Sequence, residues 1–234
     1  MRLGFWQLER EDEKLALQTL YEQRAGQVPV DFSTSLNGYL QSEQENQKEE
    51  LSFLPVRIKG QYDNQHHFYL DNRTHEGRVG FEVITPFLLA EGAVVFINRG
   101  WAPLGATRTD LPEIERINGE VEIAATIYVP VGEPFLLGAE ISSTQWPRII
   151  QSIDVNGMYE TLGLAEDQQG LGFTLRIQEG YAGELLRNWQ AINTTPEKHR
   201  AYAVQWFAMA AALLVLCLIR LFKDRKANSK REQQ

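Results

Sequence analysis

The chain has 234 residues, of which 43% are hydrophobic and 23% charged, a composition typical of folded rather than disordered proteins. Its net charge of −8 is unevenly spread. From residue 220 onward six basic residues oppose two acidic ones, a net charge of +4, so residues 1–219 carry −12. An acidic body argues against nucleic-acid binding, which needs a basic surface. The single cysteine, Cys217, excludes an intrachain disulfide and a CxxC metal or redox pair.

The N-terminal region has the residue spacing of a helix. Apolar residues recur between Phe5 and Ala25 at helical intervals, with charged residues between them. A Val28-Pro29-Val30 segment ends the pattern. We therefore expect residues 1–25 to form a juxtamembrane helix, and residues 26–194 to form a separate β-rich domain outside the cytoplasm.

Short apolar or alternating segments follow, separated by turns rich in Gly and Pro. They predict strands at Val56–Tyr62, Phe68–Asn72, Val79–Leu89, Ala93–Asn98, Glu120–Val129 and Phe173–Gln178. Gly60 is expected to mark a bulge, Pro86 to break its strand, and residues 90–92 to close an antiparallel hairpin. Asp154 is the predicted N-cap of a short helix ending at Leu164. The pattern predicts an α+β fold, mainly antiparallel β, with a small barrel-like sheet, short helices and a C-terminal transmembrane helix.

The C-terminal region has the clearest hydrophobic pattern in the chain. Ala201–Ile219 is an uncharged run of 19 residues, and at 1.5 Å per residue it spans about 30 Å, the thickness of a hydrocarbon core. A buried core helix would keep a polar face, which this run lacks. Thr195 and Pro196 have the residue types of an N-cap and a first helical position. Residues 195–222 are therefore predicted to form a transmembrane helix.

The charge distribution predicts the orientation of this helix. The positive-inside rule puts the basic tail, residues 223–234, in the cytoplasm and the acidic body on the opposite side. A domain of this size needs a signal to cross a membrane. We therefore expect an upstream transmembrane segment to precede Met1; the alternative is a body that stays in the cytoplasm.

Two groups of polar residues in the body attract attention. His66, His67 and His75 are close in sequence, but neighbouring residues of a strand point to opposite faces, so surface histidines are favoured over a metal site. Asn98-Arg99-Gly100-Trp101 ends an apolar strand. Either Trp101 packs on the rim of the barrel, or Arg99 and Trp101 form a partner-binding corner, since both types are enriched in binding hot spots.

His199 lies in the first turn of the predicted membrane helix. Tyr202 and Trp206 follow it at i+3 and i+7 and share its face. The positive end of the helix dipole favours a neutral imidazole, which is the form that ligates haem iron. The alternative is an interfacial histidine that packs or hydrogen-bonds near the headgroups.

Several motifs together resemble one family, the Surfeit-locus-one (Shy) family of cytochrome c oxidase assembly factors. They are Leu3-Gly4-Phe5-Trp6-Gln7-Leu8-x-Arg10-x-x-Glu13-Lys14; Gly60, Asn72-Arg73, Gly77, Gly80, Thr85-Pro86-Phe87 and Asn98-Arg99-Gly100-Trp101-x-Pro103; Trp146-Pro147 and Asp154; and His199-x-x-Tyr202-Ala203-x-Gln205-Trp206-Phe207. The resemblance extends from Leu3 to about Phe222, nearly the whole chain.

The resemblance implies a non-enzymatic role in building cytochrome c oxidase, with haem a delivered to or inserted into its catalytic subunit. It also implies a second membrane helix upstream and a body on the periplasmic side of a bacterial inner membrane, or its equivalent in the mitochondrial inner membrane. His199 would be the transient haem iron ligand, Tyr202 and Trp206 would shape the haem-facing surface, and Gln205 would orient a haem propionate or a partner. The alternative is a haem-independent scaffold for oxidase subunits. An enzyme ranks last, because no nucleophile–base or metal–ligand set is visible.

Overall fold

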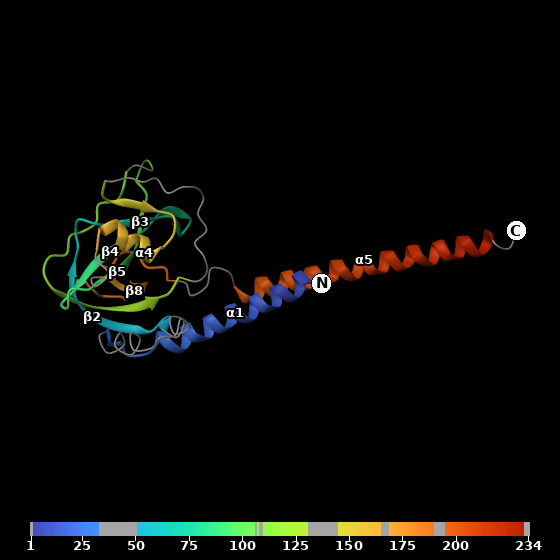
Figure 1. Ribbon diagram of the computed structural model, residues 1–234, viewed down its shortest axis with the longest axis horizontal. Helices are drawn as coiled ribbons and strands as arrows, with labels where there is room; N and C mark the ends of the chain where they lie inside the picture. The colour runs from blue at the N-terminus through green and yellow to red at the C-terminus, as the bar shows by residue number, and fades with distance from the viewer. Residues whose placement is uncertain are drawn as a thin grey trace. The chain divides into compact units, whose positions relative to one another are not determined.

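The computed structural model describes residues 2–32, 51–105, 107, 110–130, 145–164, 169–189 and 195–231. These form two compact units, one made of residues 1–22 with 190–234 and the other of residues 23–189. The first unit contains the two long helices and the second contains the sheet, as Figure 1 shows by its labels.

The elements follow the predicted order, with two short strands added. They are α1 (Arg2–Ala25), β1 (Val30–Asp31), β2 (Pro55–Tyr62), β3 (Phe68–His75), β4 (Arg78–Leu89), β5 (Val94–Pro103), β6 (Val121–Tyr128), β7 (Arg148–Ile150), α4 (Val155–Leu162), β8 (Gln169–Ile177) and α5 (Pro196–Arg231). The six predicted strands are confirmed, and α5 begins at the predicted proline. Residues 41–50 form a polar run in the sequence, for which we expect a solvated loop or an exposed helical turn, and they lie outside the described residues.

The strands of the body close into a small barrel. The sheet order is β1-β2-β6-β8-β5-β4-β3-β7, and an additional pairing of β2 with β4 closes the ring β2-β6-β8-β5-β4. Most neighbours are antiparallel, whereas β1–β2, β3–β7 and β5–β8 are parallel. The fold is therefore α+β and mainly antiparallel, as predicted, and its closure removes the open sheet edge between β2 and β4.

Two expectations about strand interruptions are wrong. Gly60 forms no bulge; it pairs with both Leu89 and Val121, where β2 passes between its two neighbours. A Cβ at Gly60 would lie 2.2 Å from the carbonyl oxygen of Leu88, so the glycine allows a close approach of two backbones. Pro86 lies inside β4 and does not break it.

The reason Pro86 is tolerated is its place in the ladder. On one side of β4, the pairing with β3 reaches Ile84, and the pairing with β2 begins at Phe87. The ladder on this side is thus interrupted at residues 85 and 86. A residue without an N–H group costs little at such a gap.

Two hydrophobic layers share β5. One layer fills the barrel with side chains of all five ring strands, and the other lies between the outer face of the sheet and α4. Nine of the ten residues of β5 are buried because both of its faces are covered. The helix α4 packs through Met158 and Tyr159, whose hydroxyl donates to the carbonyl oxygen of Val94 at 2.9 Å. Asp154 is its N-cap, as predicted, and accepts from the Gly157 N–H at 3.2 Å.

Candidate functional site

The two long helices lie side by side and run in opposite directions (Figure 1). Gly4 of α1 lies against the ring of Phe207 on α5, and Gln7 of α1 contacts His199 of α5. Residue numbers thus rise along α1 as they fall along α5. The first turns of α1 are therefore level with the start of the predicted membrane span.

A small-residue contact sets the spacing of this helix pair. Gly4 is buried, and a Cβ built on it would lie 2.6 Å from the Phe207 ring. Phe5 packs edge-on against the same ring, with 5.2 Å between the centroids. Ala203 is also buried. His199, Ala203 and Phe207 recur every four residues, so one face of α5 carries all three.

His199 hydrogen-bonds across this pair. Its Nδ1 lies 2.8 Å from Oε1 of Gln7. An amide oxygen can only accept, so this contact is a hydrogen bond when Nδ1 carries the proton. The lone pair of the neutral ring is then on Nε2, which is buried and has no hydrogen-bond partner among the described residues.

The other predicted residues of this site are exposed on α5. Tyr202 is 52% exposed and Trp206 is 39% exposed. With 3.6 residues per turn, they lie about 60° and about 20° around the helix from His199. Gln205 is also exposed, about 120° away. The two aromatic side chains therefore lie on the same side of His199 around the helix, and Gln205 lies farther round in the same direction.

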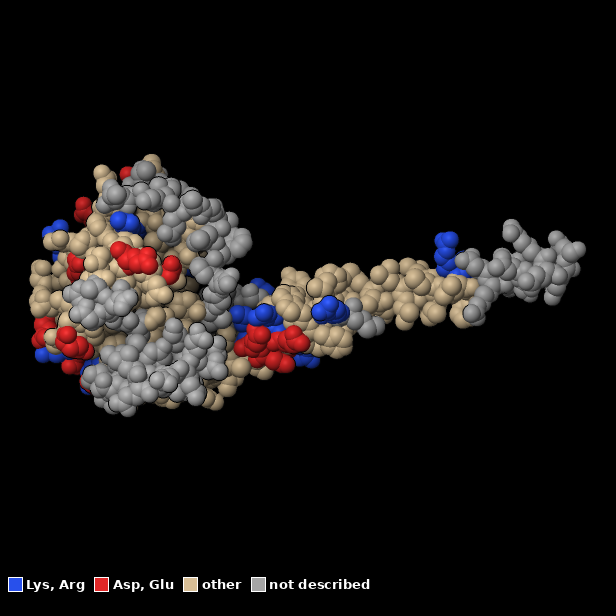
Figure 2. All heavy atoms as spheres, viewed as in Figure 1, with Lys and Arg blue, Asp and Glu red and all other residues tan. Residues whose placement is uncertain are grey.

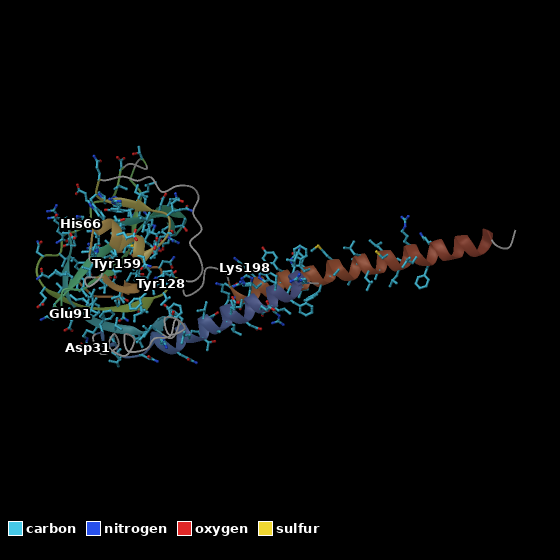
Figure 3. All side chains as sticks on the ribbon, viewed as in Figure 1. Asp31, His66, Glu91, Tyr128, Tyr159 and Lys198 are labelled. Atoms are coloured by element: carbon cyan, nitrogen blue, oxygen red, sulfur yellow. The ribbon has the colours of Figure 1, made fainter. Side chains whose placement is uncertain are left out.

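The described part of the chain contains one helix that is long and apolar enough to span a membrane, over Pro196–Lys223. Figure 2 shows its apolar stretch as tan surface without charged side chains, ending in basic residues near its C-terminal end. Lys198, labelled in Figure 3, marks the first turn. His199 is therefore in the first, charged turn of the helix, just before its apolar stretch.

In the body, the Asn98–Trp101 motif does not end its strand, contrary to the expectation. β5 continues to Pro103 through a bulge, since Val83 pairs with Gly100 and Ile84 pairs with Asn98. Arg99 is the extra residue. A bulge redirects the side chain of its extra residue.

The bulge places the Arg99 side chain wholly inside the protein, with 0% exposure. Its Nε donates to the carbonyl oxygen of Gly183 at 2.6 Å and its Nη2 to that of Glu115 at 3.1 Å. The guanidinium carbon lies 5.2 Å from the centre of the Tyr62 ring. Burial lowers the pKa of Arg99 and raises that of Tyr62 to about 12. Arg99 thus ties two loops to the barrel.

Trp101 is buried as well, with 3% exposure. Its indole N–H donates to the carbonyl oxygen of Arg73 at 3.0 Å, and its backbone N–H donates to Leu186. Arg78 lies over the ring, 5.6 Å from its centre. Of the two alternatives for Trp101, packing of its side chain on the barrel therefore agrees with the structure. With both side chains inside, any effect of Arg99 and Trp101 on a partner would be exerted through the loops they hold, and partner binding stays a prediction.

The three body histidines are in separate environments. His66 contacts Asp63 at 2.5 Å, and His75 stacks on Trp101. His67 is buried beside Thr85, at 3.0 Å, which corrects the expectation that all three are on the surface. Burial, together with the nearby Arg99, lowers the pKa of His67 from 6.5 to about 4. In the described ranges no group of three or more potential ligand side chains is placed to hold a metal ion.

Comparison with known protein families finds a match over most of the chain. The chain matches the SURF1 family over residues 1–211. The chain belongs to the SURF1 family.

Among its relatives in this family, Surfeit locus protein 1 of Xenopus tropicalis is 25% identical over 235 aligned positions, which cover 92% of this chain and 69% of that protein. The human protein of the same name is 23% identical, covering 90% and 70%. A SURF1-like protein of Rickettsia felis is 26% identical, covering 93% and 89%. The family thus includes bacterial and eukaryotic members that align with nearly the whole chain.

One contact of the candidate site was not predicted. Gln7 appears in the N-terminal motif, but no role follows from its position in sequence alone. A signal was present: Gln7 is the only residue between Leu3 and Leu8 with a polar side chain. A lone amide in an apolar helical segment indicates a specific partner, because an unbonded amide is costly away from water.

Proposed function

We propose that this protein is an assembly factor for cytochrome c oxidase that binds haem a transiently through His199 and passes it to the catalytic subunit. Membership of the SURF1 family supports the assembly role, and the apolar span of α5 supports a membrane location. The basic tail favours a body on the periplasmic side of a bacterial inner membrane, or its mitochondrial equivalent. The haem a synthesis machinery would be the supplying partner.

One observation carries the ligand assignment: Nδ1 of His199 lies 2.8 Å from the Gln7 amide oxygen, and Nε2 has no hydrogen-bond partner in the part of the chain that the structure describes. A neutral imidazole with its lone pair on Nε2 is the form that coordinates haem iron, so the residues present fit this group. Bound haem a would supply the prosthetic group that the oxidase requires. The exposed rings of Tyr202 and Trp206 would contact the flat macrocycle, and Gln205 would orient a propionate or a partner side chain.

The test is a visible absorption spectrum of the detergent-purified protein, co-expressed with enzymes of haem a synthesis. We expect a bound-haem spectrum in the wild type that is lost in His199→Ala. His66→Ala is the matched control, since His66 is half-exposed in the body and should leave the spectrum unchanged. If neither wild type nor variant carries haem, the ligand role is wrong and the haem-independent scaffold for oxidase subunits becomes the better account.

A further inference from the structure

We propose that Gln7 is a positioning residue for His199: its amide oxygen holds the imidazole proton on Nδ1 and so keeps the Nε2 lone pair available for a metal or a hydrogen-bond donor. The role as a metal-ligand support rests on the proposed haem function, whereas control of the tautomer does not. The proposal starts from the 2.8 Å contact between Nδ1 and Oε1 and from Nε2, for which the described ranges offer no hydrogen-bond partner.

The packing of the helix pair builds this contact. Gln7 lies one turn after Gly4 on α1, and His199 lies two turns before Phe207 on α5. The Phe207 ring packs directly against Gly4, which holds α1 and α5 together near the level at which the Gln7 amide reaches the imidazole. Leu3, Phe5 and Trp6 around this turn are exposed apolar residues. In such surroundings His199 is a strongly preferred partner for the Gln7 amide.

The chemical consequence follows from the two ring nitrogens. A proton fixed on Nδ1 leaves Nε2 with a lone pair, while the other tautomer would put a proton on Nε2 and block coordination. An acceptor on Nδ1–H also orients the ring and makes Nε2 more basic. Loss of such a support usually weakens metal binding about 10- to 100-fold.

A first experiment needs no haem. The full-length protein is labelled with ¹⁵N-histidine, kept in detergent micelles, and the ring nitrogens are recorded by NMR at a pH where the imidazole is neutral. His199→Asn identifies the signals of His199. We expect the Nδ1–H tautomer in the wild type, a shift toward Nε2–H in Gln7→Met, which removes the acceptor at similar volume, and recovery of Nδ1–H in Gln7→Glu. A wild-type protein with its proton on Nε2, or an unchanged tautomer in Gln7→Met, would overturn the proposal.

A second experiment titrates the same proteins with haem a. Gln7→Met should weaken binding about 10- to 100-fold. Gln7→Glu should retain binding and lower the reduction potential, since a charged acceptor makes the imidazole a stronger donor. Gln18→Met is the control, because Gln18 is on the same helix and bonds Glu22 at 2.9 Å; it should change neither readout. Unchanged haem affinity in Gln7→Met would refute the support role of Gln7. If the wild type binds no haem, the proposed function is wrong, and the NMR experiment alone decides whether Gln7 controls the tautomer of His199.

Discussion

The helix pair and the barrel both contain a polar motif that resembles the family pattern, yet the two motifs have opposite environments. Arg99 in the barrel is fully buried; its Nε and Nη2 donate to two carbonyl oxygens of its own chain, and its Nη1 has no hydrogen-bond partner among the described residues. His199 on α5 also has one bonded nitrogen and one without a partner in the described ranges, but exposed Tyr202 and Trp206 lie beside it on the helix. The comparison teaches that residue type does not separate a structural residue from a candidate ligand. The contacts that the fold makes available separate them.

The comparison predicts different consequences of mutation. Changes at the barrel motif should lower the free energy of unfolding, whereas His199→Ala should affect haem and leave the barrel intact. Three changes in the barrel test the structural half of this contrast.

The largest expected effect is at Arg99. Arg99→Ala leaves the carbonyl oxygens of Gly183 and Glu115 without their donor and opens a cavity, so the free energy of unfolding should fall by about 3–5 kcal/mol. Denaturant unfolding of the detergent-solubilised protein, followed by tryptophan fluorescence, measures it. The control is Arg57→Ala, whose side chain is 48% exposed and lies 3.5 Å from Glu122; such a pair is worth about 0–1 kcal/mol. Equal losses in both variants would show that Arg99 does not hold the loops.

The next effect is a pH dependence at His67. The pKa of His67 is about 4 in the fold, against an ordinary value of 6.5. Between these values the unfolded chain binds the proton and the folded chain does not, so stability is lost as the pH falls from 6.5 to about 4. A shift of this size corresponds to about 3 kcal/mol.

His67→Gln keeps a polar side chain near Thr85 but cannot titrate. Unfolding measured at several pH values should therefore show a shallower decline for this variant than for the wild type over that window. Parallel declines of the two proteins would exclude His67 as a source of acid sensitivity.

The smallest of the three effects is at Gly100, which has a φ of 121° beside the bulge. A Cβ there would lie 2.6 Å from the Leu186 carbonyl oxygen. Gly100→Ala should cost about 2–3 kcal/mol, from left-handed backbone strain and this contact together. Gly92→Ala is the matched control, with a φ of 92° and open space around it; it should cost about 1 kcal/mol. Thermal unfolding of both variants measures the difference, and a loss at Gly92 as large as at Gly100 would remove Leu186 from the explanation.

Much of the fold was predictable because the signals are local. Alternating apolar residues specified the six main strands, and Asp154 specified the start of α4. The expectations at Gly60 and Pro86 were wrong because each depends on a neighbour distant in sequence. Gly60 is needed because the backbone of Leu88 lies against it. Pro86 is tolerated because it falls between the part of β4 that pairs with β3 and the part that pairs with β2.

The candidate sites were predictable to different degrees. The position of His199 at the start of an apolar helix is a property of the sequence, and so is the aromatic face it shares with Tyr202 and Trp206. The burial of Arg99 is not a property of the local sequence, because a bulge in the pairing of β4 with β5 turns its side chain inward. Gln7 was missed as a partner because 192 positions separate it from His199.

The sequence by itself determined the α+β class, the apolar span of α5 and the sign of its flanking charge, because hydrophobic periodicity and charge act over a few residues at a time. Only the tertiary structure decided that the sheet closes between β2 and β4, that Arg99 lies inside, and that Gln7 holds one nitrogen of His199. Each of these depends on which distant segments the packing brings within hydrogen-bonding distance, and no local pattern specifies that.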